Sequence, residues 1–509
     1  MDKLKGKLAL GIKLVIVTIG LSILSLLAQS AIAQREFAIG LFLILSIAAL
    51  AFTYFRRKFT PLKFMLPGMI LLIAFVVSPI LYTVAMSTYN YKTGNIISKS
   101  EAIQRIQELG TTSDENGTAF DILLGTYQNM PAILATDATA GKFFISLQNR
   151  VITLSNNQVQ LNPDGVPLGA EGFEKAKDES ATANQEAKSK FYYDGKYFLQ
   201  IENLNTAIVV KQKIIYNPKS DTFIDIDQNI SYVDNGKGNY ADPNNPSQIL
   251  EPGWRAPIWF ENFASLFKDK RVRDPLLSVT IWTFTFATLT VLTQFSFGLL
   301  LALALNKKIR GRRIYRSILI LPYAMPSVMS ILIWGGMFNT EFGAINALFH
   351  TDIAWLLNSN FARFAVILVN LWLGFPYFYL VSSGALQAIP SELSEAAQID
   401  GANPRQIFWK VTLPLLLQIL SPLLISSFAF NFNNFNLIYL LTGGGPRDTL
   451  NGQIAGSTDI LISYTYQIAF GSNVQDLGLA SAISFVIFII VAAVSLYGIK
   501  RSKVLENFI

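Results

Sequence analysis

The chain has 509 residues, of which 51% are apolar and only 15% are charged, whereas soluble proteins carry roughly 25% charged residues. Its net charge of +7 favours basic loops that face anionic lipid, as in membrane proteins, over binding to nucleic acid. The absence of cysteine excludes disulfides, thiolate metal sites and cysteine nucleophiles, and the single histidine, His350, argues against a histidine metal site or a catalytic triad.

Eight apolar, uncharged segments are long enough to cross a membrane, because about 20 helical residues span its hydrocarbon core. They are residues 14–33, 37–55, 64–88, 276–305, 317–339, 364–386, 415–441 and 477–499. The pattern predicts an all-α polytopic membrane protein with an N-terminal two-helix region (1–62), a third transmembrane helix (63–89), a polar insertion (90–275) and a helical core (276–509). The first span ends in Ala31-Ile32-Ala33, which could pass for a signal-peptidase site, but its long apolar stretch favours an uncleaved helix.

Basic residues cluster in four places beside these spans, and such clusters mark cytoplasmic segments. They are Lys3, Lys5, Lys7 and Lys13; Arg56, Arg57, Lys58 and Lys63; Lys307, Lys308, Arg310, Arg312, Arg313 and Arg316; and Lys500, Arg501 and Lys503. Assigning all four clusters to the cytoplasm leaves no contradictory loop. We therefore expect both termini in the cytoplasm and the insertion at 90–275 on the outer side.

The insertion alternates runs rich in Val, Ile, Phe and Tyr with breaks that contain Asn, Asp, Gly and Pro, a pattern that predicts a small β-rich domain. The runs are Lys142–Leu147, Val151–Leu161, Tyr197–Ile201 and Thr206–Tyr216. A patch rich in Ala, Glu and Lys, Glu171–Lys190, predicts a helix that interrupts the strands. Asn116-Gly117-Thr118 matches a glycosylation sequon, which we interpret as a chance match.

The stretch Trp254–Phe267, just before the fourth span, carries Trp, Ile and Phe with few charges. Two interpretations stay open. It is either an amphipathic helix that lies along the membrane surface, or a segment in which tryptophans act as simple anchors at the interface between lipid and water.

The interiors of the eight spans contain no Asp, Glu, Lys, Arg or His. Proton-coupled transporters use such groups as relays, so proton coupling is disfavoured, although sodium coupling through backbone carbonyls stays open. The sequence also lacks G-x-x-x-x-G-K-[ST], so the chain carries no P-loop of its own. The run Gly443-Gly444-Gly445-Pro446 lacks the lysine and the helix of a P-loop, and it predicts a turn on the outer side.

Three spans instead carry neutral polar and aromatic residues at spacings that bring them to one helix face. They are Tyr323 and Ser327 in the fifth span; Asn370, Leu373, Gly374 and Tyr377 in the sixth; and Phe430, Asn431 and Asn434 in the seventh. One interpretation is that these amides and hydroxyls join the helices to one another. The other is a pocket for an uncharged polyol or sugar, because amides and phenols bond hydroxyl groups while aromatic faces cover C–H surfaces.

The segment at about 388–414, between the sixth and seventh spans, predicts a short helix followed by a turn. Ala396, Ala397 and Ala402 keep the surface of this helix slim, as a helix in a groove of another protein requires, and Gly401 allows a sharp exit. The plainer alternative is an ordinary amphipathic connector between two spans.

This segment resembles the EAA loop of ABC-importer permeases, which docks into the nucleotide-binding subunit. Glu395-Ala396-Ala397 is followed by Gly401 and then by Leu413-Pro414, as in that loop. The family usually has Ile two residues before the Leu-Pro pair, and Val411 is a conservative departure from it. The resemblance implies that Glu395, Ala396, Ala397 and Gly401 couple the chain to an ATPase.

Three further stretches, 321–327, 427–435 and 441–446, resemble more narrowly the larger permease subunit of maltose/maltodextrin importers, the MalF type. The resemblance is strong across about 276–500. Elsewhere it lies in the eight-helix plan and in the position and size of the outer insertion. It implies the fold of an ABC type I importer permease with an inserted β-rich extracytoplasmic domain.

The resemblance implies a permease subunit of an ATP-binding-cassette importer for maltose or maltodextrin, in the bacterial cytoplasmic (inner) membrane. Its sugar pocket would be lined by the nine neutral residues named above, from Tyr323 to Asn434. The implied partners are a second, smaller permease, two copies of a cytoplasmic ATPase, and an extracytoplasmic sugar-binding protein that contacts the insertion. ATP and Mg would be used by the ATPase, so the chain itself would hold no cofactor and catalyse no reaction.

The nearest alternative is a permease of the same class for another neutral sugar or for glycerol phosphate, and the lack of basic residues in the spans argues against phosphate. A membrane-embedded enzyme would need acid, base or metal groups at membrane depth, and the spans contain none. A structural or receptor subunit is the third alternative, and uptake that survives deletion of the chain would favour it.

Overall fold

A computed structural model describes residues 7–34, 36–55, 59–113, 118–137, 141–162, 167–186, 189–195, 197–306, 310–447, 453–471 and 475–501. Parts of the basic clusters, among them Arg56, Arg57, Lys58, Lys307 and Lys308, lie outside the described residues, as does Asn116 of the sequon. The contacts within the chain form two compact units, Met1–Met86 and Ser87–Ile509.

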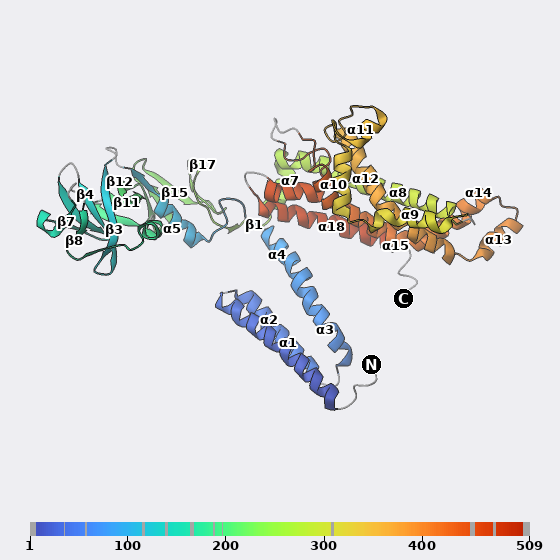
Figure 1. The fold of residues 1–509 in the computed structure, drawn as a ribbon, viewed down its shortest axis with the longest axis horizontal. Helices are drawn as coiled ribbons and strands as arrows, with labels where there is room; N and C mark the ends of the chain where they lie inside the picture. The colour runs from blue at the N-terminus through green and yellow to red at the C-terminus, as the bar shows by residue number, and fades with distance from the viewer. Residues whose placement is uncertain are drawn as a thin grey trace. The chain divides into compact units, whose positions relative to one another are not determined.

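The first unit consists of apolar helices (Figure 1). α1 (Lys7–Ala33) packs on α2 (Phe37–Phe55), and α3 (Thr60–Leu72) continues through a π-helical turn (Ile73–Val77) into α4 (Ser78–Met86). The π-helical turn ends two residues before Pro79, which has no backbone N–H to donate to the preceding turn. The first three predicted spans are therefore confirmed as helices of sufficient length and apolarity.

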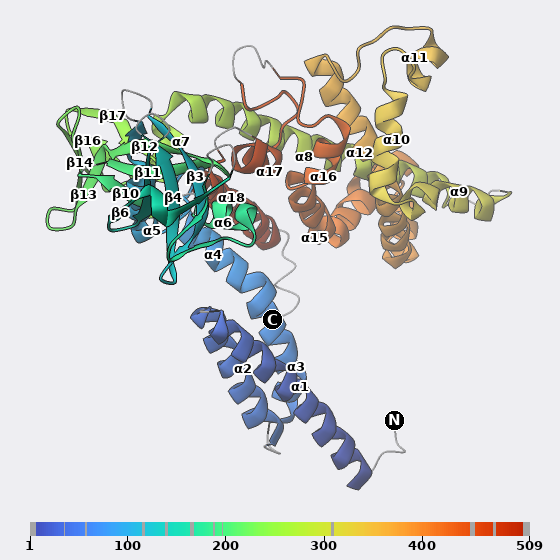
Figure 2. The same cartoon turned by 60° about the vertical axis from the view of Figure 1, so that its left-hand side comes forward.

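Within the described residues, seven helices are long and apolar enough to cross a membrane, and one bent pair would make an eighth. The bent pair is α9 (Arg312–Ala324) and α10 (Ser327–Met337), whose axes differ by 92° (Figure 2). The predicted fifth span, 317–339, is thus broken rather than continuous. Met325 is extended, with ψ 141°, because the residue before a proline avoids helical geometry.

The predicted seventh span, 415–441, is also interrupted. The apolar helix begins earlier, at α14 (Pro404–Ile407), and passes through a second π-helical turn (Phe408–Thr412) into α15 (Leu413–Phe432). After Asn433 and Asn434 a separate short helix follows, α16 (Phe435–Leu441).

Two antiparallel sheets form the β-rich domain, which confirms the prediction of strands in the insertion. The eleven-stranded sheet contains β2 (Thr111–Ser113), β3 (Ala119–Tyr127), β4 (Met130–Asp137), β5 (Lys142–Leu147), β6 (Val151–Leu154), β7 (Val159–Leu161), β8 (Pro167–Ala170), β9 (Phe173–Lys175), β10 (Lys190–Asp194), β11 (Tyr197–Asn203) and β12 (Thr206–Gln212). The five-stranded sheet contains β13 (Ile214–Asn217), β14 (Thr222–Asp225), β15 (Ile230–Asp234), β16 (Tyr240–Asp242) and β17 (Asn245–Leu250).

Two helices accompany these sheets. α5 (Lys99–Leu109) buries Ala102 and Ile106 against the five-stranded sheet, where Phe223, Tyr240 and Trp254 form the core. α6 (Glu179–Glu186) is shorter than the helix predicted at 171–190. The first part of that patch forms β9 instead, because its backbone pairs with β3.

A two-stranded ribbon joins the insertion to the helical core. β1 (Tyr89–Asn90) enters the insertion and pairs with β18 (Ala256–Pro257), which leaves it. Beside the ribbon, Gly478 at the start of α18 (Leu477–Arg501) donates its N–H to Tyr91 O over 2.9 Å. The two ends of the insertion therefore lie side by side at the beginning of one transmembrane helix.

The helical core is built on two long helices, α8 (Lys270–Ala304) and α12 (Ser359–Ala388), which pack along each other. A Cβ atom at Gly298 would lie 2.7 Å from the Cβ atom of Phe378, so only glycine permits this approach. α15 contacts both α8 and α18. The remaining core elements are α7 (Glu261–Lys268), α11 (Ala344–Phe349), α13 (Ser391–Ile399), α17 (Leu461–Tyr466) and a π-helical turn (Gln467–Gly471).

Candidate functional site

A cavity of about 690 Å³ lies where the two helix breaks face the middle of α12. All nine residues that the sequence predicts for a pocket line this cavity. They are Tyr323, Ser327, Asn370, Leu373, Gly374, Tyr377, Phe430, Asn431 and Asn434. The cavity walls also include Gln294, Ser426, Ser427 and Asn436, which sequence reasoning did not select.

The break between α9 and α10 brings Tyr323 and Ser327 to the cavity. Tyr323 is in the last turn of α9 and Ser327 is the first residue of α10, so the bend at Met325-Pro326 separates them. Tyr323 leaves 57% of its surface exposed. The residue is therefore accessible to a molecule in the cavity.

The break between α15 and α16 brings Phe430 and Asn434 to the same cavity. Asn434 caps α16, because its Oδ1 accepts the backbone N–H of Leu437 over 3.4 Å. Its amide nitrogen has no hydrogen-bond acceptor within the described part of the chain. Phe430 leaves 70% of its surface exposed and offers an aromatic face.

A chain of buried amides forms another wall and joins α8, α12 and α15. Gln294 Nε2 donates to Asn370 O over 2.6 Å, Asn370 Nδ2 donates to Asn431 Oδ1 over 2.7 Å, and Asn431 Nδ2 donates to Ser427 O over 2.8 Å. Asn370 and Asn431 are only 3% and 2% exposed. These two amides therefore join helices to one another, as the packing interpretation expects.

Gly374 makes room for this wall. A Cβ atom at Gly374 would lie 2.1 Å from Nε2 of Gln294, so any other residue would displace the glutamine amide. Gln294 was missed because it is the only amide in its predicted span, which otherwise carries threonines, serines and apolar residues. Its position depends on α12, which a pattern within one helix does not reveal.

The chemistry of the cavity is neutral. None of the described residues that line it carries a charge, and its surface combines amides, hydroxyls and aromatic rings. Within the described part of the chain, no group of three or more His, Cys, Asp or Glu side chains is arranged to hold a metal ion. The site is suited to bind an uncharged molecule rich in hydroxyl groups.

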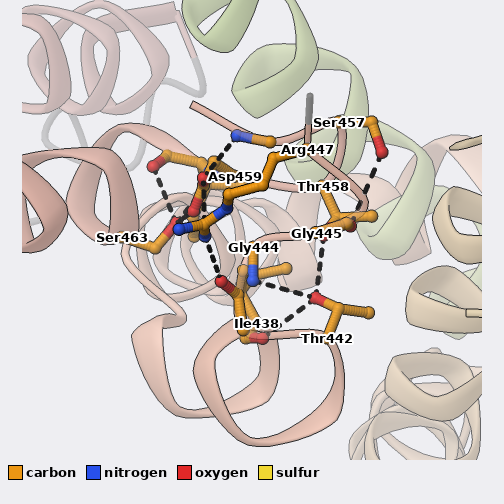
Figure 3. A network of polar contacts seen from close by, with 12 residues as sticks. Ile438, Thr442, Gly444, Gly445, Arg447, Ser457, Thr458, Asp459 and Ser463 are labelled. Atoms are coloured by element: carbon orange, nitrogen blue, oxygen red, sulfur yellow. Dashed lines mark hydrogen bonds and ion pairs between the residues drawn. The ribbon is translucent and has the colours of Figure 1, made fainter. Parts of the chain in front are cut away.

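The loop that follows α16 is fixed by a buried carboxylate (Figure 3). Asp459 is fully buried, and its two oxygens accept the N–H of Gly456 over 2.8 Å and the hydroxyl of Ser463 over 2.7 Å. Arg447 lies 3.6 Å from the same carboxylate. A Cβ atom at Gly444, where φ is +83°, would lie 2.0 Å from Asp459 Oδ1, so the loop requires glycine there.

This loop is also bonded to the long helices. Trp282 of α8 donates its indole N–H to Thr458 O over 3.2 Å, and Arg363 of α12 donates to Ser457 O over 2.8 Å. Burial raises the pKa of Asp459, although the hydrogen bonds from Gly456 and Ser463 oppose that effect. The loop thereby holds the far end of α16, whose first turn lines the cavity.

The second predicted site is the segment between α12 and α15. α13 is the short helix that the sequence predicts, and Gly401 follows it with φ +81°, the left-handed geometry of a sharp exit. Glu395 and Ala396 are exposed and Ala397 is half-buried. Ile399, 87% exposed, and Trp409, 59% exposed, add apolar surface beside them.

Comparisons with known proteins concern both the cavity and the segment that contains α13. Residues 294–503 match the family described as binding-protein-dependent transport system inner membrane component. Residues 70–148 match the family described as the N-terminal of the TM subunit in PBP-dependent ABC transporters. The first match spans the cavity residues and the segment around α13, and the second spans α4, α5 and the first strands of the insertion.

Relatives of nearly full length also match. The maltose/maltodextrin transport system permease protein MalF of Klebsiella aerogenes is 34% identical over 492 residues, which cover 92% of each chain. The MalF proteins of Salmonella typhimurium and of Escherichia coli K12 are each 35% identical, again with 92% of both chains covered. Among solved structures, a bacterial ABC transporter involved in the import of the acidic polysaccharide alginate has a TM-score of 0.41 at 22% identity, covering 48% of this chain and 84% of that one.

Proposed function

Because the chain belongs to the family of maltose/maltodextrin transport system permease proteins, we propose that its cavity binds maltose or malto-oligosaccharides during import. The chain is a permease subunit of an ABC transporter in the inner membrane, and ATP is hydrolysed by a separate subunit. One observation carries the proposal. Nine residues from three interrupted or proline-containing segments line one uncharged cavity of about 690 Å³, a volume within the usual range of about 300–1,000 Å³ for small-molecule sites.

Recognition of the sugar rests on the accessible part of the cavity. Tyr323, Ser327 and Asn434 offer hydrogen-bonding groups to sugar hydroxyls, and the exposed ring of Phe430 covers the C–H face of a sugar ring. Asn370 and Asn431 act mainly behind this surface, since their amides already bond to each other. The lack of a charged lining residue disfavours anionic or cationic ligands.

Coupling to ATP hydrolysis is proposed for the segment that contains α13. Its exposed residues, Glu395 and Ala396, and the sharp exit at Gly401 suit insertion into a groove of the ATPase subunit. Closure of two ATPase copies around ATP and Mg would move α13 and, through α14 and α15, the cavity wall that carries Phe430. The cavity would thereby open alternately to the two sides of the membrane.

The remaining partners follow the same scheme. A second, smaller permease completes the translocation path, and a sugar-binding protein docks on the β-rich insertion and delivers the sugar from outside. With the insertion outside, both termini lie in the cytoplasm. Lys63, just before the third span, and Lys500, just after the eighth, support this orientation, because basic residues mark the cytoplasmic ends of spans.

Uptake by the complete transporter tests the proposed substrate. Vesicles reconstituted with the chain and its partner subunits are supplied with binding protein and ATP, and uptake of radiolabelled maltose, maltotriose, glycerol phosphate and unrelated neutral disaccharides is measured. We expect uptake of maltose and maltotriose only. Preferential uptake of another neutral sugar would assign the cavity to that sugar, and equal uptake by Phe430→Ala would contradict a role for the cavity.

A further inference from the structure

The short helix α7 has two opposite faces and lies outside the cavity. Asn262 and Leu266, four residues apart on one face, are buried, with 7% and 1% of their surface exposed. Trp259 and the N-cap residue Phe260, just before the helix, and Phe267 on its other face leave 68%, 75% and 71% of their surface exposed. Three large rings of this exposure, so close together, require a non-aqueous neighbour.

The buried face of α7 packs on two transmembrane helices. Leu266 belongs to the same core cluster as Val279 of α8 and Ile483 of α18. The ring centroid of Phe263 lies 6.0 Å from that of Phe485 in α18. α7 therefore packs directly on the membrane-spanning core.

The position of α7 along those helices fixes its depth. α8 begins at Lys270, two residues after α7 ends, and α18 begins at Leu477. Asn262 donates to Ser87 O and to Tyr89 O, over 2.9 Å in each case, and this bonds α7 to the residues that lead into the insertion. α7 thus lies at the level where two spans start and the polar insertion ends, which is the level of the lipid headgroups.

We propose that α7 lies in the headgroup region of the outer leaflet, with Trp259, Phe260 and Phe267 inserted between lipids. The bilayer covers this aromatic face of α7, because the face is continuous with the exposed apolar surface of α8, including Leu277 and Ile281. Aromatic rings are favoured at that depth. The exposed residues Lys268 and Lys270 flank the rings and suit the lipid phosphates.

This contact also sets the depth of the insertion. Glu261 at the start of α7 pairs over 3.0 Å with Lys237, which lies between β15 and β16 of the five-stranded sheet, and Asn90 donates to the backbone oxygen of Lys237. The base of the insertion is thereby bonded to a helix that rests on lipid. The inference requires that α8 and α18 cross the membrane, and it does not depend on which sugar is transported.

Spin-label accessibility tests the proposal, and the lack of cysteine in the chain makes single-site labelling direct. Phe260→Cys and Phe267→Cys are each labelled with a nitroxide in the complete transporter, assembled with cysteine-free partners in phosphatidylethanolamine/phosphatidylglycerol vesicles. Collisions with oxygen, which concentrates in lipid, are compared with collisions with a water-soluble nickel chelate. The references are Leu204→Cys, 41% exposed in the insertion, and Ile489→Cys, 50% exposed in the middle of α18.

We expect oxygen-to-nickel ratios at 260 and 267 several-fold above that at 204 and below that at 489. Ratios equal to that at 204 would show that α7 lies in water and would overturn the proposal. Labels shielded from both reagents in the complete transporter would also overturn it, because a protein would then cover the face. Trp259→Cys replaces either variant whose complex fails to assemble.

Discussion

The amides of Asn370 and Asn434 line one cavity but have different partners. Asn370 is 3% exposed and donates to Asn431 across two helices. Asn434 accepts only the N–H of Leu437, and its amide nitrogen finds no acceptor among the described residues. The same side-chain chemistry therefore supports two roles, one in joining helices and one in contacting a ligand.

The two roles predict that alanine substitutions at Asn434 and Asn370 impair different properties of the transporter. Asn434→Ala should lower sugar transport and leave the amount of assembled complex unchanged, since removing one donor from a desolvated site costs about 1–3 kcal/mol of binding. Asn370→Ala should instead lower the yield of folded complex, because it leaves Asn431 buried without its partner. Yield and uptake are measured on the same preparations. A reduced yield of Asn434→Ala with normal transport per complex would refute its contact with sugar.

Another residue-scale prediction concerns acid stability of the insertion. The ammonium of Lys99, 2.6 Å away, and then the hydroxyl of Tyr240 hold the pKa of Asp221 down to about 2. Because this folded-state pKa is below the usual value of 3.8, Asp221 stabilises the insertion above pH 3.8 and loses that effect as the pH falls towards 2.

Protection of residues 214–250 against hydrogen exchange, corrected for intrinsic rates, measures this effect in the complete transporter. We expect constant protection between pH 7 and 5 and a decrease below about pH 4, in keeping with the linkage between proton binding and stability. Asp221→Asn should lower protection already at pH 7. Asp234→Asn, which removes the other carboxylate beside Lys99 but no tyrosine contact, is the matched control and should have a smaller effect.

At the scale of elements, α13 and the sharp turn at Gly401 form the exposed connection between α12 and α15. Glu395→Lys and Gly401→Asp should abolish transport while the chain still reaches the membrane, because both changes alter the proposed ATPase-docking surface and Gly401 has φ +81°. Glu341→Lys, the same charge reversal in the exposed loop after α10, is the control. Near-normal uptake by both test variants would remove the docking assignment.

Helical spacing predicted the lining residues of the cavity but not the helix breaks that bring them together. Tyr323, Asn370 and Asn434 could be selected because each stands at a regular interval from another polar or aromatic residue. Pro322 and Pro326 are the same residue type, yet Pro322 stays inside α9 and only Pro326 follows a break. The residue type alone therefore does not tell which of the two prolines stands at a helix break.

At the scale of the whole molecule, the β-rich insertion and the helical core meet through a narrow junction. Replacing residues 91–255 with a short turn would preserve the β1–β18 ribbon and α7. We expect the core to assemble and keep basal ATP hydrolysis, while stimulation by sugar-loaded binding protein falls. Unchanged stimulation would show that the binding protein does not need the insertion. A transporter that cannot assemble would show that the sheets stabilise the core.

Composition and hydropathy were sufficient to predict the membrane class, the apolar spans apart from the breaks in the fifth and the seventh, and a β-rich insertion. They were not sufficient for the pairing of strands, because residues such as Phe173–Lys175 have a helical composition but join a sheet through β3. The role of Asp459 was also hidden, since only the folded loop brings the Gly443–Pro446 turn and Arg447 to it. Contacts between segments distant in the sequence determine both the strand pairing and the surroundings of Asp459.

The junction between β1 and β18 has a consequence for how such proteins diverge. Neighbouring strands lie only about 4.8 Å apart, and here the first strand of the insertion is the direct neighbour of its last. Exchange of the segment between these two strands therefore leaves the two ends of the insertion as neighbours, whatever the length of the segment. Lineages that share one ancestral core are therefore free to acquire, lose or replace the entire inserted module in a single recombination event.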